Sequence, residues 1–473
     1  MQGPEHRGWL FSALILVGAI TVLRLILLAF NRTDPFVDEV QYWLWGQSLD
    51  WGYYSKPPLI AWVMRAVTDL AGSDAPFWLR MPGAVLHGVT ALILGALAAR
   101  LYGPGAALWV TAGYLTLPMV AVGSLLFSTD TVMAPPFAGA LFFWHRAAQG
   151  GLLRDAVLAG VCAGLAMMAK YAGIFILPGL ALAGLIATDW RASRRQWLVF
   201  LGLFALVISP NVVWNLTHDL ATLSHTADNA GWLREGARPS LLALLRFWAE
   251  QFAVAGPLIA AAFLWRAGQG ARGHEGGLIA FAALVLAVVS LQAFLDGANA
   301  NWAVAAWLPG SVVAMAALAA RPMLRLVSLG VNGLIAVALP LLTLFPQIGP
   351  EGNPLLQRYL GRADLSRQIL TAARNAGGLP IVAENRDVLA DLFYTGRGQS
   401  LAIYARPHAG RPRHYYEQVH ALPGDVTGAV LLVAPDAGTC PALPMVPLQT
   451  TGGAYASRGL ALWRVQAACL HGQ

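Results

Sequence analysis

Two neighbouring carboxylates, Asp38 and Glu39, follow the first apolar run of the chain and precede a short aromatic segment. Ionisable side chains at the margin of a membrane span are costly, and most are retained for catalysis or for handling ions. We expect one of the two carboxylates to accept a proton from a substrate hydroxyl while the other orients that hydroxyl. The alternative is that both acids only favour the N-terminus of a helix through the helix dipole.

A third acid, Asp130, stands between the third and fourth apolar runs, in the segment Ser128-Thr129-Asp130. An acid at such a place is as often a helix cap as a catalytic group. Its expected depth and side match those of Asp38, and a charge drawn toward the bilayer centre costs up to roughly 3 kcal/mol. We therefore expect Asp38 and Asp130 to lie close together, as catalytic acids.

Lysine is rare in this chain, because only Lys56 and Lys170 contribute lysine to the 31 Lys and Arg residues. Lys56 follows Tyr53 and Tyr54 in an aromatic turn, which we expect to bind substrate. A lysine offers a compact charge with three donors, which suits a phosphate arriving in a lipid headgroup. The alternative is that both lysines only extend to the membrane interface. The phosphate site would then be built around arginines such as Arg234, Arg238 or Arg246.

Further candidates lie in two later segments. The segment 214–246 carries His218 and His225, which could bind sugar or acceptor, or a metal ion with the neighbouring acids. Two histidines separated by six residues are a weak metal signature, and a solvated loop is the alternative. Asn301 ends an apolar run on the same side, and we expect it to line the donor pocket.

The composition indicates an integral membrane protein. Of 473 residues, 57% are hydrophobic and only 12% are charged. About eleven apolar runs approach the length of roughly 20 residues that spans a bilayer. These runs lie near 9–30, 78–99, 105–122, 131–145, 155–169, 172–187, 197–213, 247–265, 277–295, 302–320 and 326–345.

The positions of the basic residues indicate on which side of the membrane each loop lies. The net charge is +7, but the basic residues form short clusters between apolar runs, so we expect no nucleic-acid partner. Arginines recur in every second loop, which is typical of cytoplasmic loops. The first run contains Arg24 and lacks a small-residue cleavage site, which indicates a retained anchor. The segments 31–77 and 214–246 and the C-terminal tail are then predicted to lie outside the cytoplasm.

A second domain is predicted after the last apolar run, so we divide the chain into 1–348 and 349–473. Stretches at 379–383, 400–404, 429–433 and 460–465 are typical of strands, and those at 358–376 and 387–394 of helices. We expect a small α/β domain that shapes substrate access without taking part in the chemistry. Cys440 and Cys469 could pair in an oxidising compartment or remain free, and Cys162 lies in an apolar run.

The first outer loop is predicted to hold two helices in the membrane interface. Asp34 can cap a helix that Pro35 opens, and a second helix is expected from Pro57 and Pro58 onward. The aromatic residues of both segments favour a position at headgroup height.

The combination of motifs resembles the GT-C class of glycosyltransferases, and within it the bacterial aminoarabinose transferases and the protein O-mannosyltransferases. The likeness rests on the acidic pair, the Gly-Tyr-Tyr-Ser-Lys-Pro-Pro loop at 52–58, the Ser-Thr-Asp at 128–130 and the Ala-Lys-Tyr-Ala-Gly at 169–173, which includes Tyr171. By this resemblance Asp38 and Asp130 are the two acids of the site, and Lys56 lies near the donor phosphate. Aminoarabinose transferases have a glutamate where this chain has Ser55, which argues against aminoarabinose as the sugar.

The resemblance implies a mainly α, polytopic membrane enzyme of the bacterial inner membrane with its site and C-terminal domain in the periplasm. Such enzymes transfer a sugar, with inversion, from a polyprenyl-phosphate donor to a lipid, polysaccharide or protein acceptor. Membrane lipid is a further partner. No cofactor is expected to be required, although the acids could hold a divalent metal. The alternative function is transport of a lipid-linked sugar, but transporters place ionisable groups near the middle of the membrane, and here they gather at span ends.

Overall fold

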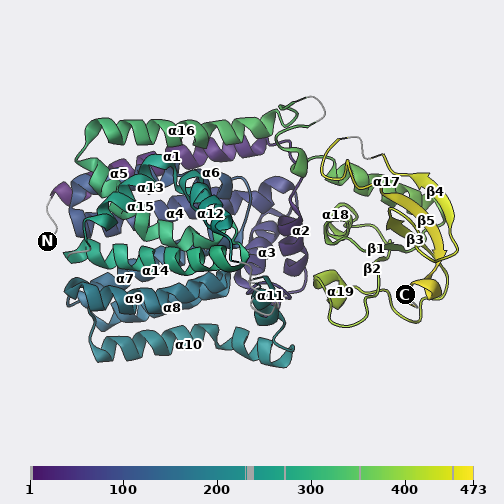
Figure 1. The fold of residues 1–473 in the computed structure, drawn as a ribbon, viewed down its shortest axis with the longest axis horizontal. Coiled ribbons are helices and arrows are strands. Elements are labelled where there is room, and N and C mark those ends of the chain that lie inside the picture. The colour runs from purple at the N-terminus through teal and green to yellow at the C-terminus, as the bar shows by residue number, and fades with distance from the viewer. Residues whose placement is uncertain are drawn as a thin grey trace.

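A helical bundle carries an α/β domain at one end in the computed structural model, which describes residues 4–229, 231, 239–270, 273–350, 353–449 and 452–471 (Figure 1). The mainly α fold class is as predicted. The bundle consists of α1 (Pro4–Ala29), α4 (Pro76–Tyr102), α5 (Pro104–Thr116), α6 (Pro118–Gly123), α7 (Thr129–Ala148), α8 (Leu153–Ala169), α9 (Ile176–Ile186), α10 (Arg194–Thr217), α12 (Leu241–Ala255), α13 (Pro257–Gly268), α14 (Gly273–Asp296), α15 (Val304–Ala319) and α16 (Pro322–Leu344).

Every predicted apolar run contains helix, but not every run is one straight span. Among the described residues, six helices are long and apolar enough to cross a membrane. The run 247–265, predicted as one span, is divided into α12 and α13, which meet at 112°. Gly256 lies at the break with φ of +86°, a conformation that side chains disfavour, and Pro257 starts the new helix. The total of eleven spans stays a prediction.

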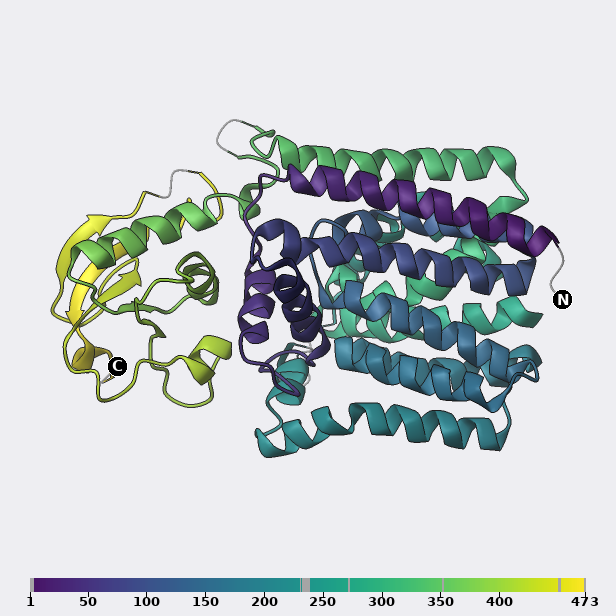
Figure 2. The same cartoon turned by 180° about the vertical axis from the view of Figure 1, so that it is seen from behind.

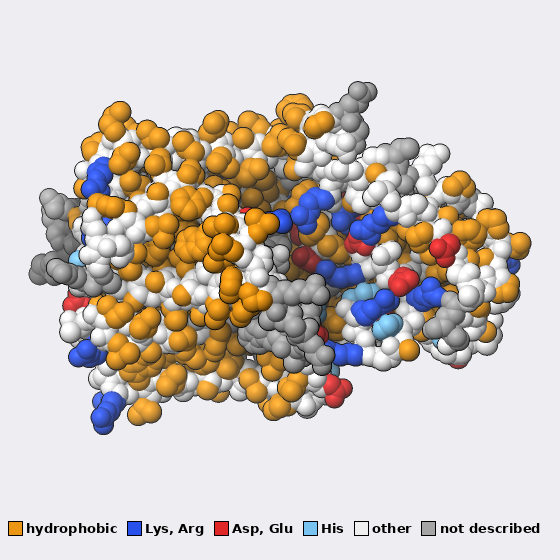
Figure 3. All heavy atoms as spheres, in the orientation of Figure 1, with side chains coloured by type: hydrophobic (Ala, Val, Ile, Leu, Met, Phe, Trp, Pro, Cys, Tyr) orange, Lys and Arg blue, Asp and Glu red, His pale blue; other side chains and the backbone are white. Residues whose placement is uncertain are grey.

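The flank of the bundle is apolar on its outside. Of the most apolar stretch of α10 and of α16, only 22% is buried inside the protein, compared with 78% for α15. Figure 3 shows this hydrophobic flank, with charged side chains gathered where the bundle meets the C-terminal domain. Outer helices therefore present apolar side chains to lipid around a central helix, as in a multi-pass membrane protein.

Two helices lie between the bundle and the C-terminal domain, α2 (Val37–Gly46) and α3 (Leu59–Ala71) (Figure 2). Asp34 does not cap α2, contrary to the sequence-based expectation. The Glu39 carboxylate accepts the backbone N–H of Phe36 at 2.8 Å and thereby serves the start of α2 itself. Asp34 instead accepts the N–H groups of Arg362 and Ala363, at the start of α17 (Arg362–Asn375).

The C-terminal domain holds a five-stranded sheet of order β2-β1-β3-β5-β4. Its strands are β1 (Ile381–Ala383), β2 (Ile403–Ala405), β3 (Ala429–Ala434), β4 (Leu443–Pro447) and β5 (Ala461–Gln466), and its other helices are α18 (Arg386–Thr395), α19 (Tyr415–Val419) and α20 (Ala467–His471). Strand β1 pairs in parallel with β2 and β3, and β5 pairs antiparallel with β3 and β4. The sequence did not indicate β4, because Pro444 and Pro447 are unfavourable in strands.

The two parts are joined by contacts that α2 and its following loop make with the C-terminal domain. Trp43 packs edge-on against Tyr394 with ring centroids 5.2 Å apart. The Tyr54 hydroxyl donates to the carbonyl oxygen of Pro412 at 2.9 Å. Arg411 forms an ion pair of 2.9 Å with Asp228 of α11 (Ala221–Asn229). The C-terminal domain therefore packs on α2, on the loop that follows it and on α11.

Cys440 and Cys469 form a disulfide in this domain, whereas Cys162 is free. We predict that a thiol-reactive mass tag labels one cysteine of the denatured full-length protein, and three after reduction. Replacing both paired cysteines with serine should lower the stability of the domain by about 3.5 kcal/mol, because the bridge closes a loop of 29 residues. Cys162→Ala is the matched control and should leave stability of the domain unchanged. Three labelled cysteines without reductant would contradict the pairing.

Candidate functional site

Glu39 is buried and fully engaged in holding the structure together. Arg80, at the start of α4, donates to its carboxylate from Nε at 3.0 Å and from Nη2 at 2.9 Å. The backbone N–H groups of Phe36 and Phe127 donate to the same carboxylate at 2.8 and 3.1 Å. Both partners of this ion pair are almost completely inaccessible. Such an arrangement fixes geometry and leaves Glu39 poorly placed to exchange a proton with a substrate.

Asp38, one residue earlier, faces the other way and is accessible. Because each residue of an α-helix is rotated by about 100° from the last, neighbours on α2 point in different directions. The Asp38 side chain is 45% exposed, and its Oδ1 accepts Nη2 of Arg386 at 2.5 Å. Arg386 is the first residue of α18, and its Nε donates to Gln41 at 2.8 Å. The C-terminal domain therefore brings a charged side chain to Asp38, and the expectation that this domain shapes substrate access without taking part in the chemistry stays a prediction.

Asp130 stands in the first turn of α7, where Ser128 rather than Asp130 provides the helix cap. Lys170 donates to Asp130 Oδ1 at 2.6 Å, and the Asn301 side-chain amide donates to Oδ2 at 3.0 Å. The side chains of Asp130 and Lys170 are each 15% exposed. Three candidate residues predicted separately therefore meet in one cluster, which joins α7, the end of α8 and the short helix η3 (Ala300–Ala303).

Lys56 lies in the loop between α2 and α3, where its carbonyl oxygen accepts the N–H of Tyr53 at 3.1 Å, and its ammonium group makes no hydrogen bond or ion pair with another described residue. Burial, and then the charge of Lys170, lower the pKa of Lys56, while Asp38 and Asp130 act in the opposite direction. Lys56 is therefore close enough to Lys170, Asp38 and Asp130 to feel their charges, although no hydrogen bond or ion pair joins it to them among the described residues. A buried ammonium without a carboxylate partner favours binding of an anion.

The loop that carries Lys56 is held from several sides. Tyr53 stacks on Trp45 with ring centroids 4.7 Å apart, and its hydroxyl donates to the carbonyl oxygens of Trp45 and Ser48. Gly52 packs against Trp214, where a Cβ atom would lie only 2.4 Å from the indole ring. Tyr53 therefore positions the loop, and its hydroxyl is occupied by the backbone.

The remaining candidate residues, His225, Tyr171 and His218, lie around this loop. The His225 ring lies 5.0 Å from that of Tyr54, and burial, followed by the charge of Lys56, lowers the pKa of His225 to about 4. Tyr171 is held by Asn211 and Asn215 below the loop. His218 stacks on Trp214 at the end of α10 and bonds to its backbone. His225 thus belongs to the cluster, whereas Tyr171 and His218 support neighbouring backbone.

A cavity of about 520 Å³ opens beside the two acids. Asp38, Tyr42, Asp130 and Asn301 line it together with many apolar side chains from α6, α7, α12 and α15. Arg358 also lines it, with its guanidinium 4.4 Å from the ring of Phe36. The combination of a polar end and an apolar wall suits an amphipathic ligand.

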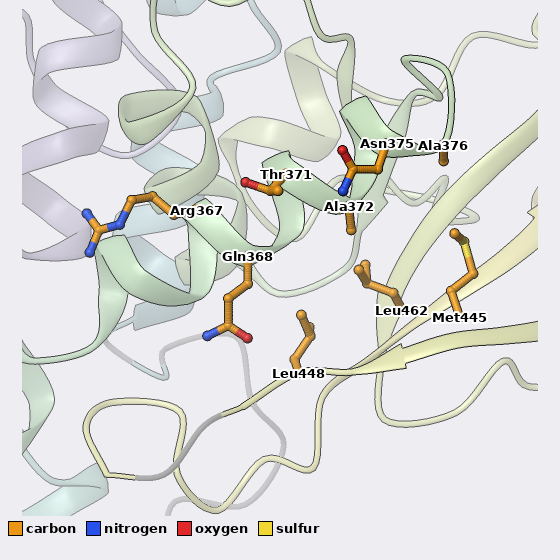
Figure 4. Close-up of a pocket in the computed structure, with 9 residues that line it drawn as sticks. All are labelled: Arg367, Gln368, Thr371, Ala372, Asn375, Ala376, Met445, Leu448 and Leu462. Carbon is orange, nitrogen blue, oxygen red and sulfur yellow. The ribbon is translucent and has the colours of Figure 1, made fainter.

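A second cavity of about 520 Å³ lies in the C-terminal domain, between α17 and the strands β4 and β5 (Figure 4). Its wall contains no acid or lysine among its lining residues, and the Arg367 side chain extends away from the others. No group of three or more His, Cys, Asp or Glu side chains suited to a metal ion occurs in the described part of the chain. Arg234 and Arg238, the alternative phosphate ligands, lie outside the described residues.

Two functional residues were missed from the sequence. Arg80 lies at the start of an apolar run, and a charge there needs a partner, so its pairing with an acid could have been anticipated. Arg386 gives no such signal, because it lies in an ordinary polar segment 348 residues from Asp38.

Comparisons with known proteins identify the family and the fold of this chain. Residues 55–214 match the family model described as dolichyl-phosphate-mannose-protein mannosyltransferase. A lipid A galacturonosyltransferase of Rhizobium johnstonii is 42% identical over 469 residues, covering 97% of this chain and 99% of the relative. A lipopolysaccharide core galacturonosyltransferase of the same organism is 26% identical over 48% of this chain and 46% of its own.

Among solved structures, ArnT of Cupriavidus metallidurans bound to undecaprenyl phosphate is similar with a TM-score of 0.67 and 16% identity, over 97% of this chain and 98% of that one. Its apo form gives a TM-score of 0.63 at 15% identity, over 98% and 99% of the two chains. The likeness extends through both the bundle and the C-terminal domain. This chain is therefore a glycosyltransferase of the GT-C fold, and it belongs to the family that includes the Rhizobium lipid A galacturonosyltransferase.

Proposed function

We propose that this protein transfers a sugar with a carboxylate group, galacturonic acid, from a polyprenyl phosphate to lipid A. The observation that carries the proposal is that Asp38 and Asp130 line one amphipathic cavity, with Lys170 bound to Asp130 and with Lys56 close enough to feel the charges of both acids. The sugar and the acceptor are those named for the 42% identical relative. Ser55 argues against an amino sugar, because no carboxylate precedes Lys56 in the sequence.

The chemistry proposed is a single displacement that inverts the anomeric centre. Asp38 takes the proton from the acceptor hydroxyl as the hydroxyl oxygen forms its bond to the anomeric carbon. The bond from that carbon to the phosphate oxygen breaks, and its electron pair leaves with the phosphate. Lys56 and Lys170 stabilise the charge that accumulates on the leaving phosphate. Asp130 holds the Lys170 ammonium in place through their hydrogen bond of 2.6 Å.

A metal ion is not needed for this step, because two lysines can neutralise a departing monophosphate. We further propose that the protein lies in a bacterial inner membrane with the candidate site and the C-terminal domain in the periplasm. Arginines recur in the loops opposite the candidate site, in agreement with the positive-inside rule. The disulfide of the C-terminal domain suits an oxidising compartment.

The experiment that tests the function is transfer by the purified protein in lipid nanodiscs. Polyprenyl-phosphate galacturonic acid and lipid A are supplied, and the lipid is analysed by mass spectrometry. The expected product is lipid A with the added mass of one hexuronic acid residue, with the opposite anomeric configuration to the donor. Unchanged lipid A, with the donor intact, would contradict the proposal.

The adjacent acids should respond differently to removal of charge. Asp38→Asn should lower turnover by about 100-fold or more with little change in stability, because it removes the base from an accessible site. Glu39→Gln should destabilise the protein by roughly 3–5 kcal/mol, because Arg80 is left buried without its counterion. Turnover and thermal unfolding of both variants in detergent distinguish the two roles. An Asp38→Asn protein with parental turnover would exclude Asp38 as the base.

The two lysines should control donor binding. Lys56→Met or Lys170→Met should weaken binding of a polyprenyl-phosphate sugar by roughly 1.5–3 kcal/mol, the value of a charged hydrogen bond. Replacement by Arg should restore part of the affinity, because a broader planar group fits a compact site less well. Acceptor affinity serves as the control and should not change. Parental donor affinity and turnover in both Met variants would show that the lysines only anchor the loop and helix end that carry them.

Donor binding should also depend on pH through Lys56. Burial lowers the pKa of Lys56 in the donor-free protein, so its charge is lost at a lower pH than that of a free lysine. Donor affinity should therefore fall as the pH rises through this lowered value. A Lys56→Arg protein should keep its lower affinity to higher pH, because arginine stays charged. Identical alkaline profiles for the two proteins would exclude Lys56 as the titrating group.

A further inference from the structure

The ion pair between Arg386 and Asp38 joins the C-terminal domain to the candidate base. The Arg386 guanidinium has two of its three nitrogens engaged, Nη2 with Asp38 and Nε with Gln41, and Nη1 has no hydrogen bond to a described residue. The two paired side chains are 38% and 45% exposed, so the pair is open to a ligand. Gln41 is buried and fixed on α2. The guanidinium can therefore turn about its contact with Gln41 without leaving the site.

The pair also creates a difficulty for catalysis. While Nη2 of Arg386 donates to Oδ1 of Asp38, that oxygen is occupied and is not free to accept the proton of a substrate hydroxyl. If Asp38 nevertheless takes a proton, its charge is neutralised and Arg386 is left without a counterion. A cation in that position, in a partly buried site, is unfavourable unless another anion replaces the carboxylate. The neighbouring acid, Asp387, is not available, because it is paired with Arg458 at 2.6 Å.

The donor phosphate does not need Arg386 as a counterion. Lys56 has no carboxylate within ion-pair distance in the described part of the chain, and Lys170 is oriented by Asp130. These two ammonium groups already provide the cations that a departing phosphate needs. Arg386 enters from a different domain, on the Asp38 side of the site, as a planar group suited to hold two oxygens of a carboxylate or a phosphate.

We propose that Arg386 recognises a second anionic group of the substrates and releases Asp38 as it does so. This inference rests on the proposed function, and the group is either the carboxylate of the transferred sugar or a phosphate of the acceptor. Both present two or more oxygens to a guanidinium. Arg386 is then a specificity-determining residue. A substrate with the anionic group draws Arg386 away and makes Asp38 available as the base. A substrate without that group leaves Asp38 paired with Arg386.

The test compares four substrate pairs in nanodiscs that contain the full-length protein. The donor is polyprenyl-phosphate galacturonic acid or the matched polyprenyl-phosphate galactose, and the acceptor is lipid A with or without its phosphates. The parent protein should prefer the anionic form of one substrate by about 10- to 100-fold in kcat/KM, the factor expected for a charged hydrogen bond. Arg386→Gln should lose this preference: its rate on the anionic form should fall, and its rate on the neutral form should rise, because Asp38 is no longer paired with a guanidinium. If Arg386→Gln loses the preference between the two donors, the group recognised is the sugar carboxylate. If it loses the preference between the two acceptors, the group is a phosphate of lipid A.

Two further variants keep the test independent of folding. Arg386→Lys keeps the charge but not the paired donors, and should retain part of the preference. Arg374→Gln, an exposed arginine on α17, is the control and should behave as the parent. Arg386→Gln with both preferences intact, or with all four rates reduced by one factor, would overturn the inference while leaving the proposed function standing. No transfer by the parent with any pair would contradict the proposed function, and this inference with it.

Discussion

The buried ion pair between Glu39 and Arg80 is the interaction on which the geometry of the site depends. Its carboxylate connects three segments, because it receives Arg80 of α4, the start of α2 and the backbone of Phe127. Phe127 lies three residues before Asp130, and Glu39 lies one residue after Asp38. A single buried carboxylate thus sets the separation of the two candidate acids. Arg80 extends the connection to Thr33 and to the Asp34 carbonyl group, at the end of the first helix.

The second constraint is that the site is completed from a distant part of the chain. Asp34 binds the start of α17, and Arg386 of α18 reaches Asp38. The C-terminal domain is therefore held beside α2, the helix that carries the candidate base Asp38. Contacts of this kind allow one domain to position a charge in the other, and both parts of the chain contribute side chains to the candidate site. Through these contacts, the position of the C-terminal domain on the bundle is linked to the chemistry proposed at Asp38.

Much of this organisation could be predicted from the sequence, and the failures have identifiable causes. Apolar runs and alternating strands located the helices and four of the five strands, because burial leaves a periodic pattern. Asp38, Asp130 and Lys170 were recognised as chemical candidates by their type and their position at span ends, and the structure brings Asp130 and Lys170 into contact. The break at Gly256 and Pro257 was present in the sequence and was overlooked.

Other features could not be read from local sequence. Asp38 and Glu39 look equivalent, but the turn of a helix leaves Asp38 accessible beside Arg386 and buries Glu39 against Arg80. The pairing of Arg386 with Asp38 depends on how two domains dock, which no local pattern reports. A double-mutant cycle between Glu39→Gln and Arg80→Gln tests the organising role of the buried ion pair most directly. We expect a coupling of about 1–3 kcal/mol in unfolding free energy, together with losses of turnover that are no greater in the double variant than in either single one. Additive effects on both stability and turnover would contradict the account.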